Sequence, residues 1–246
     1  MMEHRWLRLE DKCASGSWQM AADDWMLSRA EQGECLARIY TFAAPTVSLG
    51  YFQSAECVTG VPSLAGLSLV RRMTGGDLLV HHLELTYAIA APVEALGNVR
   101  DLPCRVHRSV SNWLARLGIE TACQGVAGKI AHADAPQDML CFLHPAGGDI
   151  LRSGHKVMGS AQRKRRGAVL QHGSLLLGTS PAATWLPGLA DLGANIGDIT
   201  TDGLAACLEL SLGCTLAPVD WPVECSVDIA SLDQSRYQSA DWNRSR

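Results

Sequence analysis

The chain mixes helical and strand-like segments, a pattern that permits an α+β fold. Apolar residues recur at helical spacing near the N-terminus and again in the middle of the chain, and runs rich in β-branched and aromatic residues lie between and after them. With 246 residues, 47% of them apolar and 19% charged, the chain can bury a sizeable core. No repeat and no linker-like stretch divides the sequence, so residues 1–246 are predicted to form a single domain.

The first predicted helix begins at Ser17, whose side chain can cap the N-terminus. Its apolar face combines residues at i, i+3, i+4 and i+7, namely Trp18, Ala21, Ala22 and Trp25. A second helix is predicted between Leu102 and Gly118, because glycine suits the position just after a helix end.

Strand-like runs fill three parts of the chain. Residues 37–53 are predicted to form two short strands separated by Pro45, and residues 67–92 two strands joined by a turn at Gly75-Gly76. Residues 154–177 resemble a hairpin with a charged turn at 164–167.

The remaining segments are a long connection and the C-terminal third. Residues 124–140 lack a clear period and are predicted to form a long connection. Helical patterns recur at 185–192 and 201–212, and from about residue 236 the chain is polar and is predicted to be a frayed tail.

Charge and cysteine content narrow the function classes. The 21 Lys and Arg residues against 25 Asp and Glu give a net charge of −4, which argues against nucleic acid as a partner. The 9 cysteines are odd in number and contain no CxxC pair, which favours neither a disulfide framework nor a zinc knuckle and fits a reducing cytoplasm. The N-terminus lacks an apolar signal region, and no run approaches the ~20 apolar residues of a membrane span. We therefore expect a cytoplasmic protein with no membrane partner.

Two pairs of adjacent residues are candidates for binding chemistry. Gly75 and Gly76 follow a strand, where paired glycines either form an ordinary turn or let backbone N–H groups approach an anion or an oxyanion. His81 and His82 are neighbours in a strand and point to opposite faces, so we predict no metal site there.

Cys141 and Lys156 are candidates for covalent and proton-transfer chemistry. Cys141 precedes a cationic hairpin that can stabilise a thiolate; alternatively it is a small buried apolar residue. Lys156 is flanked by apolar residues and either projects to solvent or enters a pocket, where loss of hydration favours the neutral amine, a usable base.

The hairpin is also the most basic part of the chain. Its Lys and Arg side chains form either a solvated turn or a docking surface for an acidic protein partner. The basic tip consists of Arg163, Lys164, Arg165 and Arg166.

Three motifs resemble those of the lipoate-protein ligase and octanoyltransferase superfamily. RRMTGGDLLVHH is similar to its Arg-Arg-x-[Ser/Thr]-Gly-Gly motif, which is followed by a strand and a histidine. GHKVMGSA is similar to its Gly-x-Lys-[Ile/Val]-x-Gly-Ser-Ala motif, and MLCFLHP, which precedes it, resembles the Cys-Phe-x-x-Pro segment of the LipM-type octanoyltransferases. The resemblance covers at least residues 18–177.

The resemblance implies a mixed, largely antiparallel sheet flanked by helices, as in the catalytic domains of biotin and lipoate protein ligases. It implies transfer of an octanoyl group from octanoyl-acyl carrier protein, through a thioester on Cys141, to a lysine of a lipoyl domain or of the glycine-cleavage H protein. Lys156 would be the second catalytic residue, and no cofactor would be needed. The substrate-binding residues that the resemblance implies are Arg71, Arg72, Thr74, Gly75, Gly76, His81, Gly159, Ser160, Ala161 and His172.

Two departures from the family pattern and two alternative functions stay open. Asp77 stands where the ligases often have a third glycine, and Gly147-Gly148-Asp149 replaces a bulkier aromatic residue and a Glu of LipM-type relatives. One alternative is ATP-dependent lipoate ligation through a lipoyl adenylate, with ATP and Mg²⁺ as cofactors. The other is a non-catalytic protein that binds an acyl group or a lipoyl domain.

Overall fold

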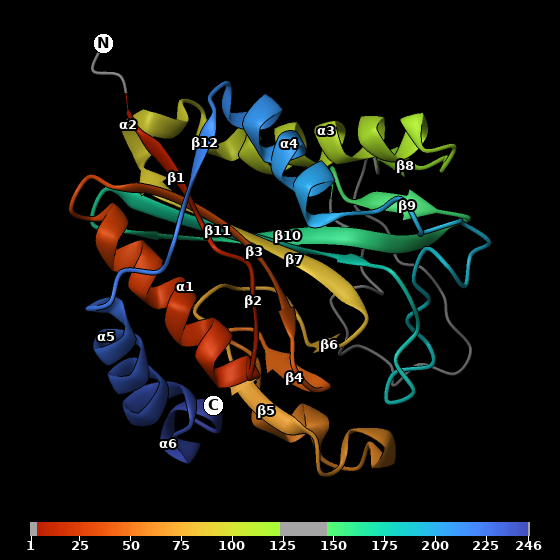
Figure 1. The fold of residues 1–246 in the computed structure, drawn as a ribbon. Coiled ribbons are helices and arrows are strands. Elements are labelled where there is room, and N and C mark those ends of the chain that lie inside the picture. The colour runs from red at the N-terminus through yellow and green to blue at the C-terminus, as the bar shows by residue number, and fades with distance from the viewer. Residues whose placement is uncertain (1–3, 124–146, 246) are drawn as a thin grey trace.

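The computed structural model describes residues 4–123 and 147–245, and within these ranges the chain forms two β-sheets (Figure 1). The main sheet runs in the order β12 (Leu216–Val219), β1 (Trp6–Leu9), β3 (Cys35–Phe42), β7 (Glu84–Pro92), β11 (Ala168–Leu176), β10 (His155–Arg165), β9 (Ile150–Arg152) and β8 (Ala122–Cys123), with β2 (Lys12–Ala14) beside β3. Strands β12, β1 and β3 are parallel neighbours, as are β2 and β3, whereas every pair from β3 to β8 is antiparallel. The prediction of a mixed, largely antiparallel sheet is confirmed.

Helices cover both faces of the main sheet. On one face lie α3 (Leu102–Arg116) and α4 (Thr201–Leu212), with the short α2 (Val93–Leu96) and the 3-10 turn η3 (Val99–Asp101) beside them; on the other lie α1 (Gly16–Ala30) and α5 (Cys225–Leu232) (Figure 1). Strand β7 shows the alternation that divides the two cores. Its Tyr87 and Ile89 pack with α3 and α4, and its Ala88 and Ala90 pack with α1.

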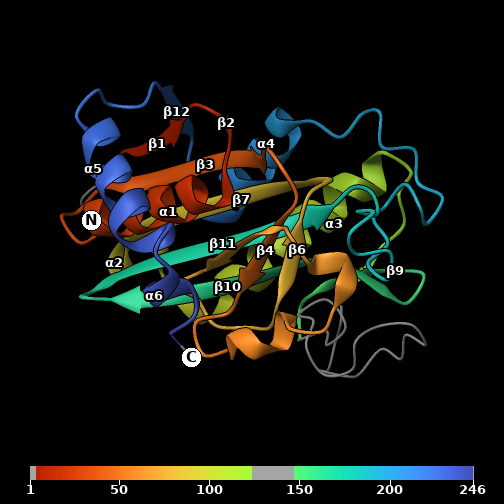
Figure 2. The same cartoon turned by 90° about the horizontal axis from the view of Figure 1, so that it is seen from below.

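The small sheet lies on the same side of the main sheet as α1 (Figures 1 and 2). It has the order β5 (Ser68–Arg71), β4 (Thr46–Leu49), β6 (Leu79–His81), and the 3-10 turns η1 (Ala55–Val58) and η2 (Pro62–Leu64) follow β4. A strand lies on each side of Gly75-Gly76, as predicted, but the second predicted strand is divided at His82-Leu83 into β6, in the small sheet, and β7, in the main sheet. Strands β5 and β6 do not form a hairpin, because β4 pairs with both of them. The glycines form a loop at the edge of this sheet.

The predicted hairpin of residues 154–177 is confirmed as β10 and β11. Arg166 and Gly167 form its turn with φ values of 45° and 80°, the left-handed conformation of a tight two-residue turn. Within the basic tip, Lys164 and Arg166 are exposed, whereas Arg165 forms ion pairs with Asp24, at 2.8 Å, and with Glu31.

The helices differ from prediction at two points. Helix α1 is capped by the Ser15 side chain, which accepts a hydrogen bond of 3.3 Å from the backbone N–H of Trp18, so it starts slightly earlier than predicted. Helix α3 is followed by Gly118 with φ of 75°, as predicted, and α4 is also confirmed. The helix predicted over residues 185–192 is wrong: this segment forms consecutive turns, because Pro187-Gly188 interrupts the apolar spacing.

The C-terminal segment is packed against the body of the protein, so the prediction of a frayed tail is also wrong. It forms a π-helical turn η5 (Asp233–Tyr237) and the short helix α6 (Ala240–Asn243). Tyr237 is 1% exposed, and its hydroxyl donates to Asp24 at 3.1 Å. Aromatic residues inside the polar sequence anchor it, because their burial outweighs the hydration of the polar neighbours. No helix in the two described ranges is long and apolar enough to cross a membrane.

Candidate active site

A cavity of about 440 Å³ lies between α1, the small sheet and strands β7, β10 and β11 of the main sheet. Its apolar lining includes Met20, Tyr40 and Leu79. The remaining lining residues are Arg72, Gly75, Gly76, Asp77, His81, Thr86, Asp149, Lys156, Gly159, Ser160, Ala161, Gln162, His172, Gly173 and Ser174. Segments that are more than 100 positions apart in the chain therefore share one site.

Most of the residues singled out from the sequence line this cavity. They are Lys156, Arg72, Gly75, Gly76, His81, Gly159, Ser160, Ala161 and His172. Thr74 lies one layer behind the lining, and Arg71 faces the C-terminal segment. Cys141 and the predicted connection at 124–140 lie outside the described residues.

Lys156 forms an ion pair with Asp149 at the wall of the cavity. The lysine Nζ lies 2.7 Å from the carboxylate Oδ2, and the two residues are 5% and 4% exposed. A buried ammonium needs a compensating charge, and Asp149 supplies it. Strand β10 has a register shift between Lys156 and Met158, and the lysine side chain passes over Gly159, where a Cβ would collide with its end. The glycine of the motif thus leaves room for the lysine.

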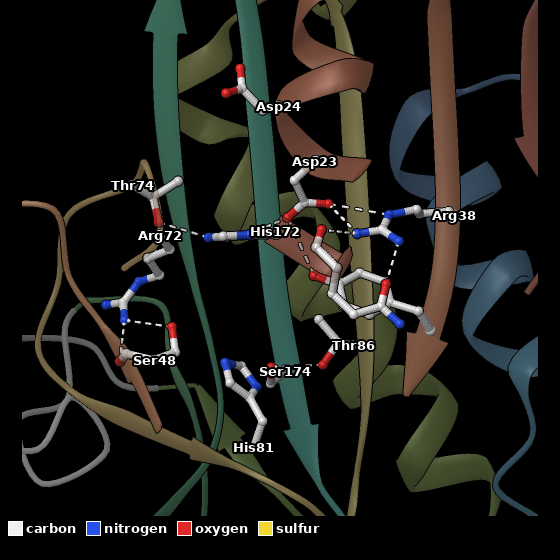
Figure 3. A network of polar contacts seen from close by, with 12 residues as sticks. Asp23, Asp24, Arg38, Ser48, Arg72, Thr74, His81, Thr86, His172 and Ser174 are labelled. Atoms are coloured by element: carbon white, nitrogen blue, oxygen red, sulfur yellow. Dashed lines mark hydrogen bonds and ion pairs between the residues drawn. The ribbon is translucent and has the colours of Figure 1, made fainter. Parts of the chain in front are cut away.

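A chain of hydrogen bonds crosses the floor of the site (Figure 3). Thr74 Oγ1 lies 2.7 Å from His172 Nε2, and His172 Nδ1 lies 2.7 Å from Asp23 Oδ2. The other carboxylate oxygen of Asp23 accepts two hydrogen bonds from Arg38, at 2.6 and 3.2 Å, and Arg38 also donates to Gln19 at 2.6 Å. Four elements, the 72–77 loop, β11, α1 and β3, are joined by this chain.

The charge state of Asp23 follows from its neighbours. Burial raises the pKa of this carboxyl, but Arg38 and His172 together outweigh burial, so its pKa lies below the ordinary value. Burial, and then the nearby Asp23, raise the pKa of the Tyr40 hydroxyl well above its ordinary value. Asp23 is therefore a carboxylate at neutral pH, and Tyr40 is a neutral hydrogen-bond donor to it.

A second polar cluster surrounds His81. The imidazole Nδ1 bonds to the buried carboxylate of Glu84, which also accepts a 2.8 Å hydrogen bond from Thr86. Thr86 Oγ1 and Ser174 Oγ lie 3.0 Å apart, and the ring of Phe42 stacks on His81 with 4.0 Å between the ring centroids. The carboxylate and the stacked ring fix the orientation of His81 at the cavity wall.

The two neighbouring arginines donate to backbone carbonyls. Arg72 donates to the carbonyls of Ser48 at 2.9 Å and Asp77 at 2.7 Å, and so ties the 72–77 loop to β4. Arg71 is 0% exposed. It donates to the carbonyls of Gly50 at 2.9 Å, Gln53 at 2.6 Å, Trp242 at 3.2 Å and Asn243 at 3.1 Å. Arg71 thus fastens the C-terminal segment behind the loop.

Sequence reasoning missed Asp23, Arg38 and Glu84 as site residues and treated Asp149 only as a departure from the family pattern. The signal for Asp23 was weak, because α1 is buried around most of its circumference and its acidic pair does not stand out against one apolar face. Among residues 4–123 and 147–245, no three His, Cys, Asp or Glu side chains come together in a way that could hold a metal ion.

Comparisons with known proteins agree with this architecture. The family model described as the lipoyl protein ligase A/B catalytic domain matches residues 15–187. Octanoyltransferase LipM of Symbiobacterium thermophilum is 29% identical over 98% of this chain and 99% of that protein. Octanoyltransferase LipM of Moorella thermoacetica is 33% identical over 72% of this chain and 67% of that protein.

Solved structures of lipoate ligases share the fold. A lipoate-protein ligase A bound with ATP superposes with a TM-score of 0.74 at 22% identity, covering 99% of both chains. A bipartite lipoate protein ligase, from a structural study with its E2 lipoyl domain from Thermoplasma acidophilum, gives a TM-score of 0.68 at 21% identity, covering 99% of this chain and 97% of that one. The family model spans most of the chain and includes both motif regions that line the cavity. The chain therefore belongs to the lipoyl protein ligase A/B catalytic domain family.

Proposed function

We propose that the chain is an octanoyltransferase of protein lipoylation. The observation that carries this proposal is the agreement between relatives named octanoyltransferase LipM, one of them matched over 99% of its length, and a cavity that combines a charged wall with apolar lining residues. Burying each CH₂ of an acyl chain contributes about 0.8 kcal/mol, so the apolar lining favours an alkyl group over a polar one.

The donor is octanoyl-acyl carrier protein, and the acceptor is a lysine of a lipoyl domain or of the glycine-cleavage H protein. A thioester donor carries its own activation, so the transfer consumes no ATP. Both proteins would meet the enzyme in the cytoplasm, in keeping with the location expected from the sequence.

The reaction proceeds in two balanced steps. The thiolate of Cys141 attacks the carbonyl of the donor thioester; a new C–S bond forms, the donor C–S bond breaks, and the proton of the Cys141 thiol ends on the leaving thiol. The amine of the acceptor lysine then attacks the enzyme thioester; a C–N bond forms, the enzyme C–S bond breaks, and a proton of the amine returns to the Cys141 sulfur.

Lys156 moves protons and stabilises the oxyanion in this scheme. Because Asp149 lies 2.7 Å from its Nζ, the lysine can hold an ammonium that donates to a developing oxyanion. In the first step the ammonium gives its proton, taken from Cys141, to the leaving thiol. The neutral amine that remains accepts a proton from the acceptor lysine in the second step. The loop with Gly75 and Gly76 lies on the same cavity and completes the polar surroundings of the carbonyl.

The test is incubation of the protein with octanoyl-acyl carrier protein in the absence of ATP, followed by intact-mass measurement. The expected result is one octanoyl adduct, mapped to the peptide with Cys141, that disappears when a lipoyl domain is added and reappears on the domain. Acylation that requires ATP and free lipoate or octanoate would instead support ligation through an acyl adenylate. Binding of the acylated proteins without any transfer would support the non-catalytic alternative.

A further inference from the structure

The contact between Thr74 and His172 joins the glycine loop to the main sheet. Thr74 has 0% of its surface exposed, while the next two residues, Gly75 and Gly76, line the cavity. Figure 3 shows the His172 ring between Thr74 on one side and Asp23 on the other. The loop thus reaches the sheet through a side chain that is itself out of contact with the cavity.

The Asp23 carboxylate determines how His172 bonds to Thr74. A carboxylate only accepts hydrogen bonds, so the Nδ1 of His172 must carry the proton that points to it. Nε2 lies 2.7 Å from the Thr74 hydroxyl, which donates to it when the imidazole is neutral and accepts from it when the imidazole is protonated, so the contact holds in both states. Arg38 holds the carboxylate in place from the opposite side with bonds of 2.6 and 3.2 Å.

The order hydroxyl, imidazole, carboxylate is that of a nucleophilic triad, but burial excludes that role for Thr74. An attacking oxygen must be reached by the substrate, and no surface of Thr74 is accessible. The same bond occupies the Nε2 of His172, so the imidazole is engaged in holding the loop rather than in taking a proton from substrate.

The loop needs such an anchor because of its composition. Gly76 has φ of 91°, and two successive glycines give the backbone more freedom than any other pair. Three groups reduce this freedom. The guanidinium of Arg72 donates to the carbonyls of Ser48, Gly75 and Asp77. The Tyr51 N–H donates to the Thr74 carbonyl at 2.8 Å, and the Thr74 hydroxyl, which bonds His172, is the attachment to the main sheet.

We propose that Thr74 and Asp23 are positioning residues, which act through His172 to hold the Gly75-Gly76 loop in its reactive place at the cavity. The expected effect on turnover rests on the proposed function, whereas the anchoring of the loop does not. Displacement of a catalytic loop by about 1 Å can cost on the order of 100-fold in rate, so the anchor is expected to affect turnover strongly.

The decisive comparison is Thr74→Val against Thr74→Ser. Valine keeps the shape and removes the hydroxyl, whereas serine keeps the hydroxyl. We expect Thr74→Val to lower kcat for a small octanoyl thioester by about 10- to 100-fold, and Thr74→Ser to remain within about threefold of the unmodified protein. Ser211→Ala is the matched control, because it removes a buried hydroxyl that donates to Cys207 at 2.6 Å on helix α4, away from the cavity. Equal kcat in Thr74→Val and Ser211→Ala would overturn the proposal, as would an acyl ester mapped to Thr74.

Hydrogen exchange separates failure of this proposal from failure of the proposed function. Peptides covering 72–77 should exchange at least about fivefold faster in Thr74→Val than in Ser211→Ala, because one anchoring hydrogen bond is lost. If the unmodified protein transfers no octanoyl group, the proposed function is wrong, and the exchange rates still decide the anchoring. Unchanged exchange of the loop would overturn it.

A double-mutant cycle tests the contribution of Asp23. If Asp23 acts through His172 and Thr74, then Asp23→Asn and Thr74→Val combined should lower kcat no further than the stronger single variant. Multiplicative losses would show that Asp23 acts by another route. Because Asp23→Asn also removes the carboxylate that pairs with the buried Arg38 and can impair folding, the Thr74 pair remains the primary test.

Discussion

Lys156 and Asp149 form a buried ion pair with 2.7 Å between the lysine Nζ and the carboxylate. Asp149 directly precedes β9, and Lys156 is the second residue of β10. The pair makes Asp149 as much a part of the cavity wall as the lysine that the family motif marks.

Asp149→Asn is expected to abolish most octanoyl transfer and to lower the free energy of unfolding by about 3 kcal/mol, because the buried ammonium loses the carboxylate 2.7 Å from its Nζ. Asp149→Glu is the matched control, since it keeps the charge and should retain substantial activity. Urea unfolding and transfer rates of the three proteins check this. Normal stability and turnover of Asp149→Asn would mean that the ion pair has no role.

Gly159→Ala is expected to lose activity while remaining folded. A Cβ at this position would collide with the end of the Lys156 side chain and lie 3.3 Å from Asp149 Oδ1, and the flexible lysine would move away. Gly178→Ala is a suitable control, because its Cβ would make an ordinary 3.4 Å contact with Leu83. Circular dichroism should show the same fold in both, with transfer lost only in the first; equal activity would argue against the need for this glycine.

Cys141→Ala is expected to abolish formation of the octanoyl adduct with no more than a small change in stability, because only the thiol is removed. Cys13→Ala, an exposed cysteine on β2, is the control and should transfer normally. Intact-mass spectra after mixing with octanoyl-acyl carrier protein make the comparison. Full turnover of Cys141→Ala would exclude the thioester route.

The residues of the basic tip are expected to have two different roles, docking of a protein substrate and stabilisation of the fold. Lys164 and Arg166 are exposed, and if they dock an acidic carrier or acceptor protein, Lys164→Glu with Arg166→Glu will raise KM for the protein substrate and spare a small thioester. Arg165→Ala should instead lower stability, because it breaks ion pairs with Asp24 and Glu31. If neither the double substitution nor added salt changes the KM for the protein substrate, these residues do not form a docking surface.

Stability in acid should depend on Asp23 in a stated direction. Burial acts to raise its pKa, but Arg38 and His172 lower it below the ordinary 3.8, so the unfolded chain binds the proton first. The stabilisation is complete above the unfolded pKa and is lost as the pH falls through the folded pKa. Urea titrations from about pH 5 to about pH 2 should show a shallower loss in Asp23→Asn than in the unmodified protein. An equally steep loss would assign the acid sensitivity to other groups.

Local sequence patterns predicted the elements whose boundaries are set locally. Helix α3 and the β10–β11 hairpin follow from periodicity and from one glycine each, Gly118 and Gly167. The place of β4 between β5 and β6 depends on pairing between distant segments, which no local pattern encodes. The helix predicted at 185–192 is a different error: the apolar residues have helical spacing, but Pro187-Gly188 prevents the backbone from forming a helix there.

The site was predictable to the extent that it lies in contiguous motifs. Lys156, His81 and the paired glycines were found because short segments carry them. Asp23 and Arg38 escaped because each belongs to an otherwise buried, regular element, and only the packing of α1 on β3 brings their charges together. Arg71 illustrates the reverse, since it shares a motif with Arg72 but faces the C-terminal segment.

The fastening of Arg71 sets a lower limit on how far the chain can be shortened. The family match ends at residue 187, yet the guanidinium next to the glycine loop relies on carbonyls at Trp242 and Asn243. A protein shortened to residues 15–187 would lack two of the carbonyls that accept hydrogen bonds from the fully buried Arg71. It would also expose the face of α1 that packs against α5 and η5. The smallest working unit is therefore expected to include Trp242 and Asn243, which lie beyond the region that the family model matches.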